Sequence, residues 1–293
     1  MKDSISLRFL YRTVIGRAIL KLLINPAVSK PAGFLLSTRF SKLFIPHFIK
    51  KNNIDLTDIE IPFGGFGSFN DFFTRIRKSP VPKPAASQLI SPCEGFLTPL
   101  EIRNDIILDI KNTSYSLSDL LKDDKLAEAF KNGTALIFRL TPANYHRYCY
   151  SADGNIRRHE KLSGKLHCVR PVALRTLPVF VQNSREYQLI ESDSFGSIIQ
   201  MEVGALMVGK ISNYISEAQN QRVLAGEEKG YFEFGGSTII LLFQQGAVSI
   251  KKDLFDRKDA FDEIPVQIGE ILADAGMFSQ SITENTVSSP RSL

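Results

Sequence analysis

The sequence contains few cysteines and no long hydrophobic segment. Its 293 residues include only three cysteines, too few and odd in number for a disulfide framework, so we expect a reducing compartment such as the cytoplasm. No uninterrupted apolar run approaches the roughly 18 to 20 residues that span a bilayer. A secretory signal peptide is not expected, because basic residues recur through the apolar N-terminal stretch and no small-residue cleavage site follows it.

Positive charge is concentrated at the N-terminus. The net charge is only +5, yet ten of the Lys and Arg residues lie within residues 1–51, against one acid, Asp3. The same segment is rich in Leu, Ile and Phe, and Arg12, Arg17 and Lys21 interrupt it at helical intervals. This pattern predicts an amphipathic helix on an anionic membrane surface. The alternative is a set of helices packed on the domain with solvated basic faces. Nucleic acid is not an expected partner, because no nucleic-acid-binding module accompanies the basic stretch.

Apolar periodicity and turn residues divide the rest of the chain. Prolines split residues 4–51 into two or three helices, and a glycine-rich connector leads to Ser68, the expected N-cap of a short helix through Arg77. Further helices are expected at 117–131 and 262–275. Short β-like runs occur at 97–102, 106–110, 134–140, 179–180, 187–190, 197–203, 206–211, 238–243 and 247–250.

The predicted fold class is α+β, because strands outnumber helices and no βαβ alternation occurs. With 43% hydrophobic residues the chain can bury a full core. We expect a mainly antiparallel, partly closed β-sheet core with an N-terminal helical, membrane-associating region. The expected divisions are a basic amphipathic helical region at 1–65, a catalytic β-rich domain at 66–278 and a flexible tail at 279–293.

The sequence Gly235-Gly236-Ser237-Thr238 runs directly into the apolar segment 239–243. Two glycines and a serine before a β-branched run are common hairpin residues. They also suit a bent peptide bond at which a hydroxyl attacks the carbonyl before it, because glycine tolerates a positive φ. These residues alone leave both interpretations open.

Six sequence blocks carry a family resemblance. In order, they are Phe69-Asn70-Asp71-Phe72-Phe73-Thr74-Arg75; Ser91-Pro92-Cys93-Glu94-Gly95; Arg139-Leu140-Thr141-Pro142 with Tyr145-His146-Arg147; Asn183-Ser184-Arg185-Glu186; Val203-Gly204-Ala205 with Val208-Gly209; and Gly226-Glu227-Glu228-Lys229-Gly230 ahead of Gly235-Gly236-Ser237-Thr238. Together they resemble phosphatidylserine decarboxylase proenzymes, a family of pyruvoyl-dependent decarboxylases.

The resemblance implies a self-processing enzyme. The Ser237 hydroxyl would attack the Gly236 carbonyl, and elimination of the resulting ester would leave a covalent pyruvoyl group derived from Ser237. The products would be a β chain (1–236) and an α chain (237–293) that stay together as a heterodimer. The pyruvoyl group would form a Schiff base with phosphatidylserine and release CO₂ to give phosphatidylethanolamine, without an external cofactor. The expected location is peripheral, on the cytoplasmic side of an anionic membrane.

Two positions depart from the family pattern. Most relatives carry Asp where this chain has Glu94, and a second His where it has Cys149. Our hypothesis is that His167 replaces the missing base, with Glu94 as its orienter, while His146 donates the proton that follows loss of CO₂. The alternative for His167 is a packing or surface role.

Other residues of these blocks are expected to support the structure or the substrate. They are Arg75, Tyr145, Arg147, Asn183, Arg185 and Gly235; Arg75 would cap backbone carbonyls or meet a lipid phosphate. No metal is expected, because the His-Cys spacing is unusual for zinc. Two other functions stay open: decarboxylation of a different amino acid, and an unprocessed, inactive lipid-binding relative.

Overall fold

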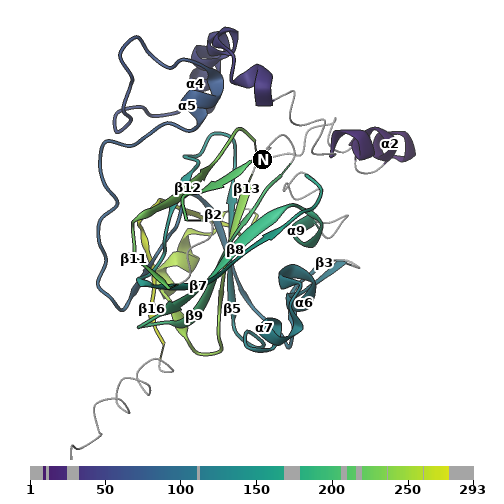
Figure 1. The fold of residues 1–293 in the computed structure, drawn as a ribbon, viewed down its shortest axis with the longest axis vertical. Helices are drawn as coiled ribbons and strands as arrows, with labels where there is room; N and C mark the ends of the chain where they lie inside the picture. The colour runs from purple at the N-terminus through teal and green to yellow at the C-terminus, as the bar shows by residue number, and fades with distance from the viewer. Residues whose placement is uncertain are drawn as a thin grey trace, which may run out of the picture.

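A computed structural model describes residues 9–10, 13–24, 33–110, 113–167, 179–205, 210–215, 220–235, 237–259 and 261–276. These residues form a β-rich body with helices against one side and a further group of helices, including α4 and α5, at one end (Figure 1). The fold is therefore α+β with mainly antiparallel sheets, as the sequence predicts.

The largest sheet has eight strands, and every neighbouring pair in it is antiparallel. Its strands, in spatial order, are β11 (Gln221–Val223), β7 (Gly154–Leu162), β8 (Arg185–Ser192), β9 (Gly196–Val203), β13 (Ser237–Phe243), β5 (Thr134–Leu140), β2 (Gly95–Glu101) and β15 (Ile264–Val266). The sheet ends at two unpaired edges, β11 and β15, so the expected partial closure is not found.

Strand β13 occupies the middle of this sheet because its side chains are apolar on both faces. Every residue of the strand is buried. Ile240 and Leu242 belong to the core on one face, whereas Ile239 and Leu241 belong to the core on the other. This is the alternation of a strand covered on both sides. Ser237, two residues before Ile239, faces the second of these cores.

Layers of different kinds cover the two faces. The face of Ile240 packs against helices α6 (Leu117–Leu121), α7 (Asp124–Glu128) and α9 (Val179–Gln182), and against Leu20 of α2 (Val14–Leu23). The face of Ile239 packs against two small antiparallel sheets. They are β10 (Ile211–Asn213), β12 (Glu228–Phe232) and β6 (Arg147–Cys149), and β1 (Gln88–Ile90), β16 (Ile271–Ala275) and β14 (Val248–Ile250). Strands β3 (Ile106–Ile110) and β4 (Thr113–Ser116) form a separate hairpin.

An aromatic cluster joins the N-terminal helices to the body. It involves the 3-10 helix η1 (Arg39–Phe44), α4 (Ile45–Asn52) and α5 (Phe69–Phe73). Phe48 of α4 packs edge-on against Phe69, and Phe69 and Phe73 both contact Phe234. Phe234 lies just ahead of β13, so this cluster reaches the turn that precedes Ser237. The division of the chain at residue 65 stays a prediction.

Several expected elements are corrected by the structure. The helix expected at 117–131 is two helices, because Lys122 adopts a left-handed φ of 54° and the Asp123 carboxylate caps α7 by accepting from the Leu126 amide. The helix expected at 262–275 is wrong: β15 and β16 form there. Residues 179–180 belong to helix α9 rather than to a strand. Strand β7, which is rich in charged residues, was not expected.

The start of α5 is confirmed, since the Ser68 hydroxyl accepts a hydrogen bond from the Asp71 amide at 3.1 Å. The helix ends at Phe73, however, and not at Arg77. Residues 206–209 of an expected strand and the expected tail at 279–293 lie outside the described residues. Among the helices that are described, none has the length and apolarity needed to cross a bilayer.

Candidate active site

Ser237 begins the central strand directly after a strained turn. Gly235 has a φ of 146°, a conformation that side-chain-bearing residues rarely adopt. Gly236 lies outside the described residues. The Ser237 side chain is fully buried, and its Oγ makes no hydrogen bond to any described residue. An unpaired buried hydroxyl costs free energy, on the order of 1–3 kcal/mol, so its persistence at this position needs a functional reason.

His146 lies beside the same turn. Its backbone carbonyl accepts from the Phe232 amide at 3.0 Å, and its ring stacks on Phe73 with 4.0 Å between centroids. The imidazole Nδ1 is 2.9 Å from the carbonyl oxygen of Asn144. Because a carbonyl only accepts, Nδ1 carries the proton, and Nε2 is left with its lone pair in the neutral ring.

Burial keeps this imidazole neutral. Desolvation lowers the pKa of His146 to about 3; the nearby positive charge of Arg75 adds to the shift, while the hydrogen bond that the ring donates to the Asn144 carbonyl opposes it. The Phe73 ring that contacts the imidazole also contacts Phe234, so the ring of His146 lies close to the turn before Ser237. At neutral pH, His146 is therefore an uncharged group able to accept a proton.

Glu94 holds the loop that carries His146. Its Oε1 accepts from Asn144 Nδ2 at 2.8 Å, and its Oε2 accepts from the Tyr145 amide at 3.1 Å. Asn144 in turn presents its carbonyl oxygen to His146. Both hydrogen bonds that Glu94 accepts come from residues next to His146. The sequence paired Glu94 with His167 instead, and that pairing stays a prediction.

A second polar cluster lies at the end of β9. The amide oxygen of Asn183 accepts from the His167 backbone N–H at 2.8 Å, and its Nδ2 donates to the carbonyls of His167 and Gly204. The His167 side chain is buried. Desolvation lowers its pKa to about 4; the charge of Lys165 adds to the shift, and a hydrogen bond with Gln182 opposes it.

Sheet register brings Ser237 between the two clusters. On one side, Ser237 lies opposite Leu140, the last residue of β5, from which the loop to His146 departs. On the other side, Thr238 lies opposite Val203, the last residue of β9, which is followed by Gly204. The two strands that flank β13 therefore each deliver one histidine region to the end at which Ser237 lies.

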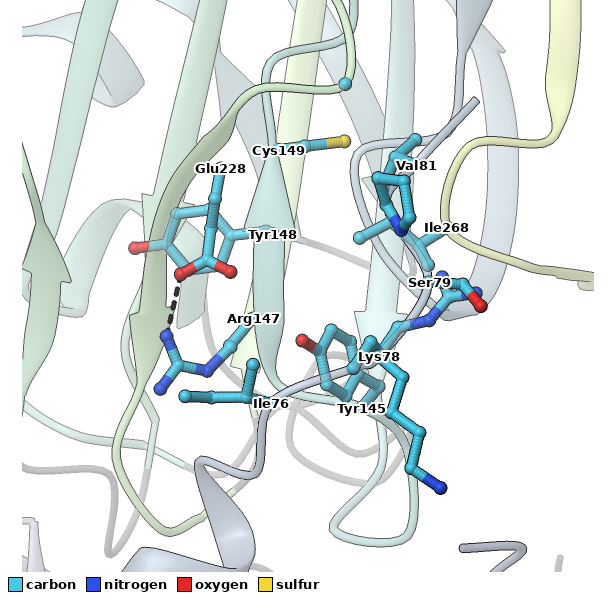
Figure 2. Close-up of a pocket in the computed structure, with 13 residues that line it drawn as sticks. Ile76, Lys78, Ser79, Val81, Tyr145, Arg147, Tyr148, Cys149, Glu228 and Ile268 are labelled. Atoms are coloured by element: carbon cyan, nitrogen blue, oxygen red, sulfur yellow. Dashed lines mark hydrogen bonds and ion pairs between the residues drawn. The ribbon is translucent and has the colours of Figure 1, made fainter. Parts of the chain in front are cut away.

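Arg147 and Tyr145 point into a cavity next to this site. The cavity has a volume of 370 Å³, with Arg147 and Glu228 at one side and Ser79 and Val81 at the other (Figure 2). Arg147 donates to Glu228 at 2.7 Å and to the backbone carbonyl of Thr74 at 2.8 Å. Arg147 thus ties the end of α5 to β12, with Glu228 as its acidic partner.

Known proteins resemble this chain over most of its length. Residues 69–274 match the family model for phosphatidylserine decarboxylase. Phosphatidylserine decarboxylase proenzyme 2 of Clostridium acetobutylicum is 39% identical over 271 residues, which are 92% of this chain and 91% of that protein. The phosphatidylserine decarboxylase proenzyme of Ruminiclostridium cellulolyticum is also 39% identical, over 92% of this chain and 90% of that protein. The chain belongs to the phosphatidylserine decarboxylase family. The resemblance stated from the sequence blocks is confirmed.

Burial makes the two described cysteines, Cys93 and Cys149, unreactive. Burial raises the pKa of Cys149 to about 12 and that of Cys93 well above its ordinary value. Both are therefore neutral thiols at physiological pH and poor nucleophiles. The described residues hold no cluster of three or more His, Cys, Asp or Glu side chains that could bind a metal. Cys168 lies outside them.

Arg185 holds the backbone in this member of the family. Its guanidinium donates to the carbonyl oxygens of Leu120, Val181 and Asn183, and also to that of Asp119. Such a set of carbonyl contacts joins α6 to the start of β8. Arg185 is therefore part of the scaffold beneath Asn183.

Sequence reasoning assigned no role to three groups near the site, of which Lys229 and Glu202 are fully buried and Asn144 is partly buried. Asn144 links Glu94 to His146 but was not singled out; its position two residues before His146 is the only signal. Lys229 and Glu202 form a fully buried ion pair of 2.5 Å on the face of the sheet toward which Ser237 points. Glu202 lies opposite Ile239 across β9 and β13, a pairing that needs the sheet register to be seen.

Proposed function

We propose that this chain is a phosphatidylserine decarboxylase proenzyme that cuts itself between Gly236 and Ser237. The observation that carries the proposal is the buried, unpaired hydroxyl of Ser237, held at the start of the central strand after the strained Gly235 turn. The printed name of the relatives, which includes the word proenzyme, agrees with self-cleavage.

Ser237 is the nucleophile in this proposal, and His146 is its base. The neutral Nε2 of His146 takes the hydroxyl proton as Oγ attacks the carbonyl carbon of Gly236. The C–N bond then breaks, the nitrogen takes up the proton and leaves as the free amine of residue 237, and an ester joins Oγ to Gly236. Glu94 acts as a positioning residue, because it fixes Asn144, whose carbonyl oxygen fixes the tautomer of His146. His167, the base expected from the sequence, is the competing candidate.

β-Elimination breaks the bond between Cβ and Oγ, so residue 236 leaves as a carboxylate and residue 237 becomes dehydroalanine. Water then hydrolyses the imine form of this residue, which releases ammonia and leaves a pyruvoyl group. Its ketone supplies an electron sink for the electron pair that remains when the substrate carboxylate leaves as CO₂. His146 then has the second role expected from the sequence, which is to deliver a proton to the carbon that loses CO₂. The product from phosphatidylserine is phosphatidylethanolamine.

The two chains made by cleavage stay together in this proposal. Strand β13 is hydrogen-bonded along its length to β5 on one side and β9 on the other, all of it in the core. Strands β14 and β16, which also follow the cut, pair with one another, and β16 pairs with β1. A cut before residue 237 breaks none of these ladders, so we infer a heterodimer of chains 1–236 and 237–293.

We propose that the N-terminal helices dock the enzyme on an anionic membrane, on the cytoplasmic side that the scarcity of cysteine favours. Phe34, Leu35, Phe40, Leu43 and Phe44 expose between 64% and 83% of their surface. Arg39, Lys42, Lys50 and Lys51 are exposed in the same segment. Apolar side chains flanked by cations suit an interface with anionic lipid.

Self-cleavage is tested by the mass of the purified protein. The wild-type chain should give two fragments, and the one that begins at residue 237 should carry a pyruvoyl group in place of serine. Ser237→Ala should stay a single chain of 32.8 kDa. Among histidine variants, His146→Asn should slow cleavage at least about 100-fold, the usual worth of a general base, whereas His167→Asn should still be cut.

Each result separates the candidates. An uncut His167→Asn beside a normally cut His146→Asn would return the base role to His167. An uncut wild-type chain without a reactive carbonyl would overturn the proposed function as a whole.

A further inference from the structure

Arg75 is a buried cation without an acidic partner. It exposes only 4% of its surface, and it forms no ion pair with any described residue. Its Nε and Nη1 are buried and lack hydrogen-bond partners among the described residues, and Nη2 makes two long contacts of 3.3 Å to the carbonyls of Ala143 and Asn144. A guanidinium normally uses its five N–H groups in a fork that matches a carboxylate or phosphate. Most of that capacity is unused here.

The surroundings of Arg75 explain why none of the described acids forms an ion pair with it. Glu94 is the acid whose charge acts most strongly on Arg75, but both of its oxygens are engaged by Asn144 and Tyr145. The guanidinium packs instead against aromatic rings, 5.2 Å from the centroid of Phe72 and 5.9 Å from that of Tyr145. Rings stabilise a cation less than an anion does, and they leave the N–H groups free to donate.

Arg75 lines a cavity of 490 Å³ that has a second unpaired cation. Lys78, also on its wall, donates only to the Thr57 carbonyl and has no acidic partner in the described part of the chain. Lys78 also lines the neighbouring cavity of Arg147 and Tyr145, but its ammonium end extends away from both of these residues (Figure 2). Two acids, Glu60 and Asp71, also line the space. The Asp71 carboxylate accepts a hydrogen bond from the Gly67 amide at the start of α5.

One wall of this cavity is apolar and continues to the surface. Ile61, Pro62 and Phe66 contribute to it. Ile61 is 58% exposed, and its neighbour Phe63 is fully exposed. A space with a buried cation in its wall, an exposed cation beside it and exposed apolar residues at its edge matches an amphiphile whose anionic group lies inside and whose chains lie outside.

The cavity also adjoins the proposed chemistry. Arg75 lies two residues after Phe73, whose ring stacks on His146. The charge of Arg75 is one of the causes that lower the pKa of His146. An anion bound to Arg75 would therefore be held near the imidazole that serves Ser237.

We propose that this cavity receives the phosphodiester of the substrate phospholipid, with the Arg75 guanidinium as its main partner and Lys78 as a second cation. The inference rests on the proposed function and names the group by which the lipid is held. Binding requires the guanidinium to turn toward the cavity. This turn breaks the two long hydrogen bonds from Nη2 to the carbonyls of Ala143 and Asn144.

The phosphodiester, and not the serine carboxylate, is the anion that suits Arg75. The phosphodiester keeps its single negative charge from substrate to product. The carboxylate leaves as neutral CO₂, so a guanidinium bound to it would stabilise the substrate more than the transition state and slow the reaction. A cation that binds the phosphate stabilises the bound substrate and the transition state equally, so it lowers KM and leaves kcat unchanged.

Kinetics with a monomeric short-chain lipid tests the assignment. Processed enzyme is assayed with dihexanoyl phosphatidylserine, and with dihexanoyl phosphatidylcholine as an inhibitor that has the phosphodiester but no primary amine. Arg75→Gln should raise KM, and weaken the inhibition, at least about tenfold, the size expected for a lost charged hydrogen bond, with kcat within about threefold. Arg75→Lys should recover part of the loss. The exposed Arg103→Gln is the control that should change neither value.

A second variant keeps the test decisive if Arg75→Gln is not processed. Lys78→Gln changes an exposed side chain and should raise KM about threefold and reduce its dependence on salt. Unchanged KM and inhibition in the Lys78 and the processed Arg75 variants, or a loss confined to kcat, would overturn the phosphodiester site while wild-type activity upholds the proposed function. An uncut, inactive wild-type chain would overturn both.

Discussion

Burial controls the protonation of the two histidines whose segments flank the start of β13. Desolvation lowers the pKa of His146 to about 3 and that of His167 to about 4. Both are neutral at pH 7, so both have the protonation state of a base. The two histidines differ in which of their groups neighbouring residues hold in place. Glu94 and Asn144 fix the ring of His146, whereas Asn183 fixes the backbone of His167.

These lowered pKa values predict the direction in which pH changes stability. An unfolded histidine titrates near pH 6.5, whereas the folded His146 stays neutral down to about pH 3. Between these values the unfolded chain binds more protons, so the free energy of unfolding should fall as pH falls, by up to about 1.4 kcal/mol per pH unit for each such histidine. Urea unfolding from pH 7 to pH 4 measures it. Ser237→Ala, an uncut background, keeps self-cleavage out of the comparison, and in that background His146→Asn should show a shallower slope. An unchanged slope would contradict the assigned burial effect.

At the scale of elements, the turn before β13 and the strand itself have opposite characters. The strand is buried between β5 and β9, and its residues satisfy one another's backbone groups. The turn places Gly235 at a φ of 146° immediately before the proposed cut. A rigid strand that follows a strained peptide segment can hold a hydroxyl against the preceding carbonyl without sharing the strain.

A matched pair of glycine variants tests whether this strain serves cleavage. Gly246, with a φ of 73°, lies in the turn at the far end of β13. Alanine at either position should cost about 1–3 kcal/mol of stability. Only Gly235→Ala should also slow the appearance of the fragment that begins at residue 237. Equal cleavage rates in the two variants at equal stability would show that the φ of Gly235 has no part in the reaction.

At the scale of the whole molecule, the N-terminal helices and the site form one aromatic cluster. Phe48 of α4 contacts Phe69, and Phe73 and Phe234 continue the cluster to the turn before Ser237. The surface that we propose for membrane docking is therefore joined to the site by packed side chains. This arrangement suits a substrate whose acyl chains remain in the bilayer while its headgroup is processed.

Membrane docking predicts that vesicle binding depends on exposed apolar residues of η1. Phe40 and Leu43 are 83% and 75% exposed. The double variant Phe40→Ser, Leu43→Ser should weaken binding to anionic phospholipid vesicles at least about tenfold, since burial of each side chain contributes about 1.5–3 kcal/mol. Phe255→Ser with Phe261→Ser, both on the exposed surface of the body, is the control. Equal co-sedimentation of the two double variants would contradict the proposal.

The sequence by itself determined the family, the serine and the strand that follows it. The order of motifs around Tyr145-His146-Arg147 and Gly235-Gly236-Ser237 is enough for the family, and the apolar run after Ser237 is enough for a buried strand. These features are local: a motif or a period survives in the linear chain. The same reliance on local pattern made the prediction for residues 262–275 wrong. Their apolar spacing fits a helix, but in the folded chain β15 pairs with β2 and β16 pairs with β1.

Only the tertiary structure decided which groups meet. Glu94 and Asn144 lie 50 residues apart in sequence, and only the folded loop shows that the carboxylate serves the segment of His146. Likewise, only the folded chain shows that none of the described acids forms an ion pair with Arg75. Hydrogen bonds, desolvation and charge pairing act over a few ångströms between residues that the sequence separates. The sequence therefore named candidate reacting groups, but their protonation and partners had to come from packing.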